Sequence, residues 1–350
     1  MSWRHFRPVG FIDSPTISGS QVARLAGSKL YFTHYEIGEA GQAALRLVPV
    51  SSIAAELRNE TEALTIKRII APRPPVALTQ GALRFDQPSV VGIVSVKARA
   101  STNGPTHAQL DAAVARGIDM AAVGAVLVDV DGDTTPPGAG PVWQGDERAR
   151  VVPIVAALAA AGVAVSIKTR NASVMDAALK GGAVIVHDVS AVMDDREVWP
   201  LLQGATCPII IRHWTNKGRS RRGPGRDDGV APQTYEWLKI RADVIEEHGI
   251  SRSRLIVDPG IGHSGSVADD LALLNNLALF HGLGCPIMVD APCVRLIGDS
   301  ARETSADQSA AVAVHAANQG VQLLRVHDVA ATVQALRVRR DSRNQALVRD

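Results

Sequence analysis

Apolar runs and helical patterns alternate regularly along the chain from residue 89 onward. Each short run rich in Val, Ile, Leu or Ala is followed by a longer segment whose apolar residues recur at helical spacing. The predicted strands are 90–96, 125–130, 163–168, 183–189, 207–212, 254–258, 285–290 and 321–327. The predicted helices are 106–123, 147–161, 173–180, 195–202, 232–248, 267–281, 305–319 and 329–340.

Eight strand-then-helix units in series predict an α/β protein with a (β/α)8 TIM barrel. The length of this part of the chain is close to the ~250 residues typical of that fold. A doubly wound parallel sheet is the alternative fold. That fold would need fewer units, and no G-x-G-x-x-G follows the first strand, which disfavours its dinucleotide-binding version.

The first part of the chain follows a different pattern. Short alternating segments at 29–35 and 44–50 precede a helix-like segment at 52–63. Three prolines between positions 72 and 75 then exclude a helix, and the apolar segments on either side of Thr79-Gln-Gly predict a β-hairpin. We therefore expect a small N-terminal extension at residues 1–75 and a barrel at 76–350, with the hairpin leading into the barrel.

Composition and charge exclude several classes of protein. The 350 residues carry 37 Lys+Arg and 35 Asp+Glu, a net charge of +2, which disfavours nucleic-acid or membrane-surface binding through bulk charge. The longest uncharged apolar stretch, 151–167, contains Pro153 and Gly162 and predicts a helix followed by a strand, not a membrane span. The three cysteines show no zinc or disulfide spacing, and the N-terminus lacks a secretory pattern, so we expect a cytoplasmic protein.

Polar residues stand at nearly every predicted strand end, where the chemistry of a barrel is found. Because charged side chains are rarely buried unless they are paired, their density predicts a polar pocket with ion pairs inside it. For any one of these residues, the alternative is a structural role, in which the side chain only forms contacts that hold neighbouring loops in place. The residues are Ser95, Asp129, Lys168, His187, Arg212, Asp258, Asp290, Arg325 and His327.

Two of these strand ends suggest particular ligands. Asp258 begins a glycine-rich loop that can hold a polar heterocycle or an anion, although an ordinary strand-to-helix turn is the alternative. Arg325 and His327 alternate with a valine and so point to one side of their strand, which suits a phosphate. Their alternative role is ion pairing with Asp188 or Asp328. A basic, glycine-rich segment at 217–226 is expected to be a solvated loop, with an anion-gripping lid as the other interpretation.

Several segments, in this order, resemble dihydropteroate synthase over about residues 76–340. The last predicted strand carries RVHDV (325–329), which matches the family motif letter for letter. The segment IVDPGIG (256–262) is similar to LLDPGFGFGK, and LVDVDGDTTPPGAG (127–140) is similar to IDVGGESTRPGA. The segment at 165–190 is similar to VSVDTSKPEVARAALEAGAHIINDVS.

The resemblance implies a function in folate biosynthesis. The family condenses a dihydropterin methyl diphosphate with p-aminobenzoate and releases diphosphate with the help of Mg²⁺, and its members are commonly homodimers. Asp258 matches the family's pterin-binding aspartate, and Arg325 and His327 match its diphosphate-binding pair. The matching second loop contributes Thr134 and Thr135, together with Asp129.

The chain also departs from the family at positions that contact substrate or metal. Ser95 replaces the metal-linked asparagine, Lys168 replaces a pterin-binding aspartate, and His187 replaces a pterin-binding asparagine. Further family cations are replaced by Pro136, Cys293 and Val294, and the first loop lacks the family motif. We therefore expect a dihydropteroate synthase of reduced or altered activity. The alternatives are a non-catalytic paralogue that binds a pterin, an anion or a partner subunit, and another pterin- or folate-dependent transferase.

Overall fold

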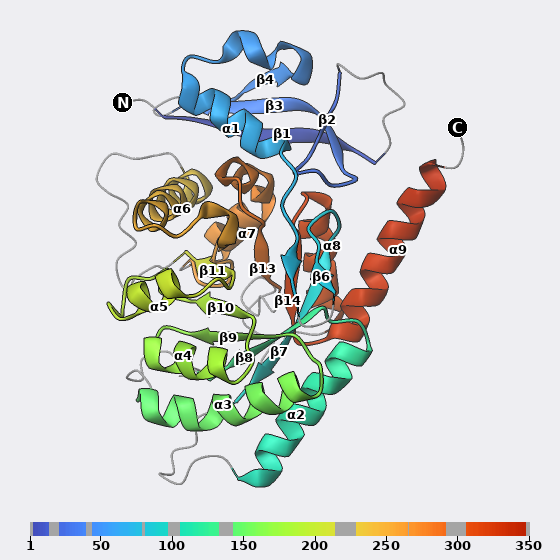
Figure 1. Cartoon of the computed structure of the whole chain (residues 1–350). Helices are drawn as coiled ribbons and strands as arrows, with labels where there is room; N and C mark the ends of the chain where they lie inside the picture. The colour runs from blue at the N-terminus through green and yellow to red at the C-terminus, as the bar shows by residue number, and fades with distance from the viewer. Residues whose placement is uncertain are drawn as a thin grey trace.

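A computed structural model describes residues 3–13, 21–39, 44–78, 81–96, 106–132, 143–213, 229–264, 266–291 and 306–347. Within these residues eight parallel strands stand in the order β12-β11-β10-β9-β8-β7-β14-β13. A parallel bridge between Val257 and Ile287 joins the first strand of that series to the last and closes the ring. The predicted (β/α)8 barrel is therefore confirmed (Figure 1).

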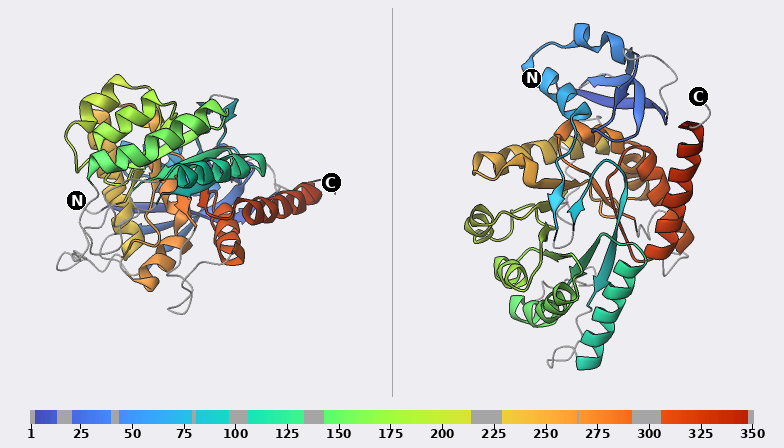
Figure 2. Two further views of the ribbon diagram at one scale, coloured as in Figure 1. Left: turned by 90° about the horizontal axis from the view of Figure 1, so that it is seen from below. Right: turned by 45° about the vertical axis from the view of Figure 1, so that its right-hand side comes forward.

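The barrel elements fall close to their predicted positions, with the helices outside the strands (Figure 2). The strands are β7 Ser89–Ser95, β8 Leu127–Asp131, β9 Val165–Thr169, β10 Ile185–Asp188, β11 Ile209–Arg212, β12 Leu255–Asp258, β13 Met288–Asp290 and β14 Leu323–Val326. The helices are α2 His107–Ala122, α3 Gln144–Ala160, α4 Ala172–Lys180, α5 Val198–Gly204, α6 Val230–Glu247, α7 Val267–Asn275, α8 Ala306–Asn318 and α9 Val329–Leu347. The 3₁₀ helices η2 Arg252–Arg254 and η3 Leu277–Leu283 complete this part.

The N-terminal extension folds as an antiparallel sheet. Its strands are β1 Arg4–Ile12, β2 Ala23–Arg24, β3 Tyr31–Glu39 and β4 Arg46–Pro49, and β3 pairs with the other three. The buried side chains of Phe6, Phe32 and Tyr35 form its core together with residues of the helix α1 Glu60–Ile70. The sheet and α1 lie at one end of the barrel, beside the C-terminal end of α9 (Figure 1).

The predicted helix at 52–63 is wrong in its position. A 3₁₀ helix, η1 Val50–Glu56, ends before Asn59, and α1 begins at Glu60. The Asn59 side chain accepts a hydrogen bond from the Glu62 backbone N–H at 3.0 Å. An asparagine in this position caps a new helix, and its extended backbone interrupts the preceding one.

The predicted hairpin is confirmed as the antiparallel pair β5 Val76–Ala77 and β6 Ala82–Leu83. Leu83 and Phe85 pack against the apolar side chains that start the barrel strands. Those side chains belong to Val91, Leu127, Ile185, Ile210, Ile256, Met288 and Leu323. Because every second residue of a strand faces the same side, the residues two positions further on continue the barrel interior and are mostly polar. Apolar side chains therefore close the barrel interior at one end, and polar side chains line it at the other end.

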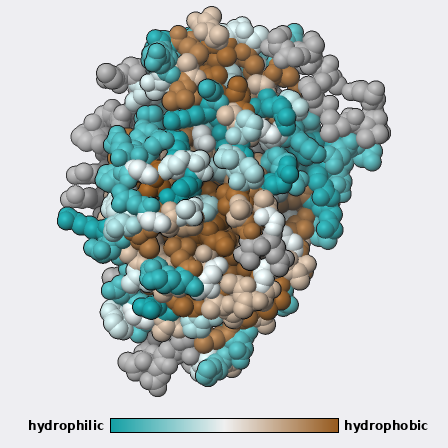
Figure 3. Space-filling view, viewed as in Figure 1, coloured by the Kyte–Doolittle hydropathy of each residue, from teal (hydrophilic) through white to brown (hydrophobic). Residues whose placement is uncertain are grey.

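Apolar surface gathers in the middle of the face seen in Figure 1 and on the N-terminal extension (Figure 3). Leu47 of β4 and Leu45 just before it contribute to the apolar surface of the extension, and the two residues are 62% and 59% exposed. None of the helices within the described residues combines the length and the hydropathy that a membrane crossing requires.

We expect the stability of the fold to fall with pH through the buried imidazole of His281 in η3. Its ring Nε2 lies 3.1 Å from the Gln319 carbonyl, while Nδ1 is buried without a partner. Burial, aided by the Arg73 cation, lowers the pKa of His281 to about 3. The unfolded chain therefore takes up the proton first, near pH 6.5, and stability is lost as the pH falls from there towards 3.

The substitution His281→Gln keeps an N–H donor for the Gln319 carbonyl and removes this titration. Between pH 6.5 and 5, the wild type is expected to lose about 2 kcal/mol more than the variant, at ~1.4 kcal/mol per pH unit for one proton. Urea unfolding at the two pH values measures the difference, and the exposed His248→Gln is the matched control. Equal losses in the wild type and His281→Gln would show that His281 does not titrate in this way.

Candidate active site

A buried ion pair between Arg325 of β14 and Asp129 of β8 lies at the centre of the polar end of the barrel, which we call the barrel mouth. The Arg325 Nε donates to Asp129 Oδ2 at 2.6 Å. Asp129 also accepts from Ser166 Oγ at 2.6 Å and lies 3.1 Å from His187 Nδ1. Since β7 separates β14 from β8 in the sheet, this contact spans the inside of the barrel.

Electrostatics keep this pair charged. Burial would raise the pKa of the Asp129 carboxyl, but Arg325 and His187 hold it well below its usual range. A carboxylate can only accept hydrogen bonds, so the His187 Nδ1 carries a hydrogen, and in the neutral ring Nε2 is then an acceptor. Within the described residues that Nε2 is buried without a hydrogen-bond partner.

Two further carboxylates approach the same guanidinium. Arg325 Nη1 donates to both oxygens of Asp290 on β13, at 3.1 and 3.0 Å, and Nη2 lies 3.5 Å from Asp131 Oδ2 on β8. Burial would lower the pKa of Arg325, but these carboxylates raise it well above its usual value. The alternative partners expected for Arg325 are wrong. Asp188 accepts from the backbone N–H groups of residues 190 and 192, and Asp328 accepts from that of residue 331 in α9.

Lys168 of β9 is also paired. Its Nζ donates to Asp131 Oδ2 at 2.7 Å, and the two residues are register partners on neighbouring strands. Both side chains are largely buried, with 14% and 8% exposed. The positive charge at the position where the resemblance places an aspartate is therefore balanced by a carboxylate on the adjacent strand.

Asp258 at the end of β12 keeps an acceptor available. Its Oδ1 accepts from the Gly260 N–H at 2.8 Å, whereas the fully buried Oδ2 has no partner among the described residues. Burial raises the pKa of Asp258, and the Arg212 cation opposes part of the increase. Gly260 has a φ of +77°, and a Cβ there would lie 2.9 Å from the His213 carbonyl, so the turn that orients Asp258 requires glycine.

The remaining site residues lie further out or beyond the described part. His327 follows β14 and is exposed, but partial desolvation of its ring beside the barrel, together with the Arg325 cation, lowers its pKa. Ser95 is half-buried at the end of β7, where its carbonyl accepts from Arg116 Nη2 at 3.4 Å. Thr134 and Thr135 lie outside the described residues, as do Pro136, Cys293, Val294 and the basic segment 217–226.

Asp290 was predicted as a residue of the polar pocket, but nothing in the sequence paired it with a particular cation. Two further residues of the network, Asp131 and Ser166, had no predicted role. Ser166 precedes Lys168 by two residues on β9 and so faces the same side, and this alternation is the signal that could have identified it.

The described residues do not fit a resident Mg²⁺. Magnesium is usually held by one or two carboxylates together with substrate phosphates. Ser95 offers a neutral hydroxyl, and its register partner Asp131 is already paired with Lys168. Within the described ranges, no three His, Cys, Asp or Glu side chains cluster in a way that could hold a metal.

A closed (β/α)8 barrel with unpartnered acceptors at the carboxyl ends of its strands belongs to the class of barrels that bind polar small molecules. The family described as pterin binding enzyme matches residues 91–327. The dihydropteroate synthase of Mycobacterium leprae is 36% identical over 263 residues, which cover 71% of this chain and 91% of that protein. The chain belongs to the dihydropteroate synthase family, as its sequence predicted.

Solved structures agree with this assignment. The dihydropteroate synthase from Xanthomonas albilineans in complex with 7,8-dihydropteroate is 32% identical, with a TM-score of 0.66, and the match covers 77% of this chain and 98% of that one. The same enzyme with 4-aminobenzoic acid gives 34% identity and a TM-score of 0.67 with the same coverage.

Proposed function

We propose that the protein binds a reduced pterin in the barrel mouth and acts in folate biosynthesis as a dihydropteroate synthase of low or altered activity. The observation that carries this proposal is the buried, unpartnered Asp258 Oδ2, together with the unpartnered His187 Nε2, which is an acceptor in the neutral ring. A pterin ring presents N–H donors that such acceptors bind, and buried acceptors without partners cost stability until a ligand satisfies them. The dihydropteroate bound to the Xanthomonas relative supports the ligand class.

The reaction of the family makes separate demands on the pocket. The amine nitrogen of p-aminobenzoate forms a bond to the pterin methylene carbon, the C–O bond to diphosphate breaks, and the amine gives up a proton. Asp258 and His187 would hold the pterin ring in place for this attack. The departing diphosphate gains negative charge at the oxygen that leaves, so cations positioned there lower the barrier.

The cations of the mouth are already engaged, which supports low activity. Arg325 is surrounded by three carboxylates, and Lys168 is neutralised by Asp131. A diphosphate would have to compete with these carboxylates for the same donors. The same feature favours the alternative that the protein is a non-catalytic paralogue which binds a pterin. The implied Mg²⁺ and the homodimer stay predictions.

The proposal predicts that Asp258→Asn weakens binding of a dihydropterin at least about tenfold, because an N–H donor replaces the acceptor and faces donors of the ring, at ~1–3 kcal/mol per unpaired group. Titration calorimetry with a dihydropterin methyl diphosphate measures the affinity. Asp111→Asn, an exposed carboxylate on α2, is the matched control and should bind as the wild type does. Unchanged affinity in Asp258→Asn, or no binding by the wild type, would contradict pterin recognition at this site.

A further inference from the structure

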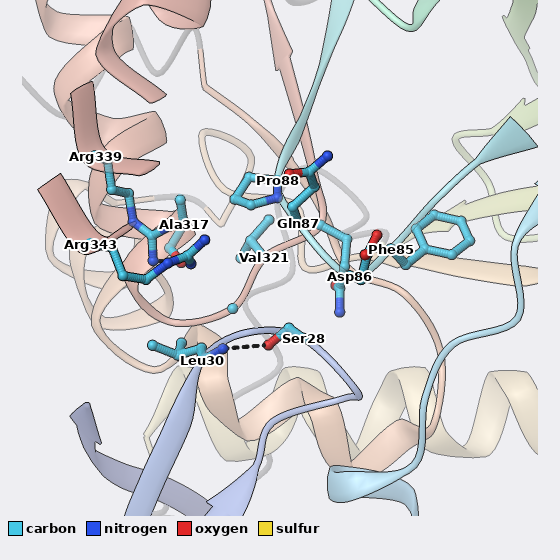
Figure 4. Close-up of a pocket in the computed structure, with 12 residues that line it drawn as sticks. Ser28, Leu30, Phe85, Asp86, Gln87, Pro88, Ala317, Val321, Arg339 and Arg343 are labelled. Atoms are coloured by element: carbon cyan, nitrogen blue, oxygen red, sulfur yellow. Dashed lines mark hydrogen bonds between the residues drawn. The ribbon is translucent and has the colours of Figure 1, made fainter. Parts of the chain in front are cut away.

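A crevice lies between the N-terminal extension and the barrel, at the end opposite the barrel mouth. It has a volume of about 250 Å³, part of it open to solvent. Arg339 and Arg343 enter it from α9, and Ser28 and Leu30 of the extension lie on its other side (Figure 4). Gln322, which directly precedes β14, also lines it. We call this space the Arg343 crevice.

Arg343 is a buried cation without a counterion. Only 6% of the residue is exposed, and within the described part of the chain it makes no hydrogen bond or ion pair. The neighbouring Arg339 donates to Asn318 Oδ1 at 2.6 Å and to the Ala317 carbonyl at 3.0 Å. Both acceptors are neutral, and Arg339 is itself a cation, so it does not balance the charge of Arg343. The Arg343 Nε is buried without a partner among the described residues, whereas the two terminal nitrogens are not among the buried unpartnered atoms. A buried donor of a charged group is unfavourable without an acceptor, so an anion that reaches this Nε would be stabilised.

A second buried donor faces the same need. Gln322 is 1% exposed, and its Oε1 accepts from the Ile287 backbone N–H at 2.8 Å. Because that partner can only donate, the amide orientation is fixed and Nε2 is left as a donor. This Nε2 is buried and has no partner among the described residues. Both unsatisfied groups that line the crevice are therefore donors, and a ligand that satisfies them must be an acceptor.

The surroundings favour a negative ligand. The Ser28 hydroxyl oxygen accepts from the Leu30 N–H at 3.1 Å, and its hydrogen is a further donor at the rim (Figure 4). Asp86 is the acidic residue of the lining, and its carboxylate is held by Arg84 through two contacts of 3.2 Å. Asp13 of the extension opposes part of the effect that burial and Arg343 have on the pKa of Arg339. The positive charge of the crevice therefore rests chiefly on Arg343.

We propose that the Arg343 crevice binds a small oxyanion of the phosphate or sulfate class through the Arg343 guanidinium and the Gln322 amide. The anion links α9, the start of β14 and the Ser28 loop, and so fastens the N-terminal extension to the barrel. The close approach that builds the crevice depends on Gly320, with φ +83°, where a Cβ would lie 2.4 Å from Leu25 of the extension. This site is independent of the barrel mouth and of the proposed function.

Thermal unfolding with inorganic phosphate, against sodium chloride of equal ionic strength, tests the proposal. Phosphate at a hundred times its dissociation constant is expected to raise the wild-type Tm by roughly 5 °C or more. Gln322→Glu keeps the acceptor for Ile287 and brings a carboxylate to Arg343. This variant should have a higher Tm than the wild type in chloride and should lose the phosphate increment.

Arg343→Met removes the unpaired cation and is also expected to lose the phosphate increment, with a Tm at or above that of the wild type in chloride. Arg337→Met, an exposed arginine of the same helix, is the control and should keep the full increment. Sulfate and acetate in place of phosphate separate a tetrahedral oxyanion from a carboxylate. An increment that survives in Gln322→Glu and Arg343→Met would place the anion elsewhere and overturn the proposal, as would the absence of any increment in the wild type.

A crystallographic measurement locates the anion directly. Selenate, which has the shape of sulfate and a strong anomalous signal, is expected to give a peak between Arg343 and Gln322 in wild-type crystals. The peak should be absent in Gln322→Glu crystals grown in the same condition. Selenate peaks at other places and none in the crevice would contradict the assignment.

Discussion

Dihydropteroate formation by the purified protein is expected to be at least about 100-fold slower than by the synthase of Escherichia coli, a relative of 30% identity. Each substrate group left without its partner costs ~1–3 kcal/mol, and ~1.4 kcal/mol corresponds to a tenfold change in rate. Two lost contacts are enough for the stated factor. The structure shows where the losses arise, since Lys168 offers a donor where the family has an acceptor and Arg325 is shared among carboxylates.

A direct assay with dihydropterin methyl diphosphate, p-aminobenzoate and Mg²⁺ measures this rate. Complementation of a synthase-deficient strain is the second measurement. Growth at the rate given by the Escherichia coli enzyme would contradict the prediction. It would imply that cations outside the described residues, such as Lys97, Arg99 or Arg295, serve the leaving group.

A set of restoring variants separates a changed pocket from a repurposed one. Lys168→Asp alone places a new carboxylate beside Asp131, and two adjacent carboxylates disfavour ionisation of both. Lys168→Asp with Asp131→Asn and Val294→Lys avoids this clash and returns the family's residue types at positions 168 and 294. The triple variant is expected to exceed Lys168→Asp at least about tenfold in pterin affinity. No gain would indicate that the rest of the pocket has acquired another ligand.

The barrel and the location of its polar end could be predicted because both follow from local patterns. Alternation along each strand puts Asp129, His187 and Arg325 on the inside, and parallel strands bring their carboxyl ends to one rim. The hydrogen-bond and ion-pair partners of these side chains could not be predicted, because they depend on how far each side chain extends across the barrel interior. Asp188 lies two strands beyond Asp129 in the ring but is held by backbone N–H groups of its own loop, which removes it as a partner for Arg325.

The N-terminal sheet was recognisable only in part for a different reason. Strand β1 contains Pro8 and Gly10, which interrupt the sequence signal for a strand. Proline is tolerated here because β1 is at the edge of the sheet and pairs with β3 alone. The pairing of Pro8 with Tyr35 connects residues far apart in the chain, so no local pattern contains it.

Replacement of Arg325 by Met is expected to lower the free energy of unfolding at pH 7 by about 3–5 kcal/mol, the cost of breaking a buried ion pair by removing one partner. The substitution leaves Asp129 and Asp290 buried without the cation that neutralises them. Urea unfolding measures the loss. Lys180→Met, which breaks an exposed pair with Asp176 on α4, is the control and should change the stability little.

The pH dependence of that loss tests its electrostatic origin. In the wild type the pKa values of Asp129 and Asp290 are lowered despite their burial, because of Arg325, so the stability they provide is present above pH ~4 and is lost as the pH falls below it. Without Arg325 the largest contribution that lowers both pKa values is lost, so burial raises them towards those of the unfolded chain. The variant therefore loses less stability than the wild type as the pH falls from 7 towards 4, and its deficit relative to the wild type narrows. A deficit that stays constant over this range would mean that Arg325 stabilises the barrel through packing and not through the charges of its carboxylate partners.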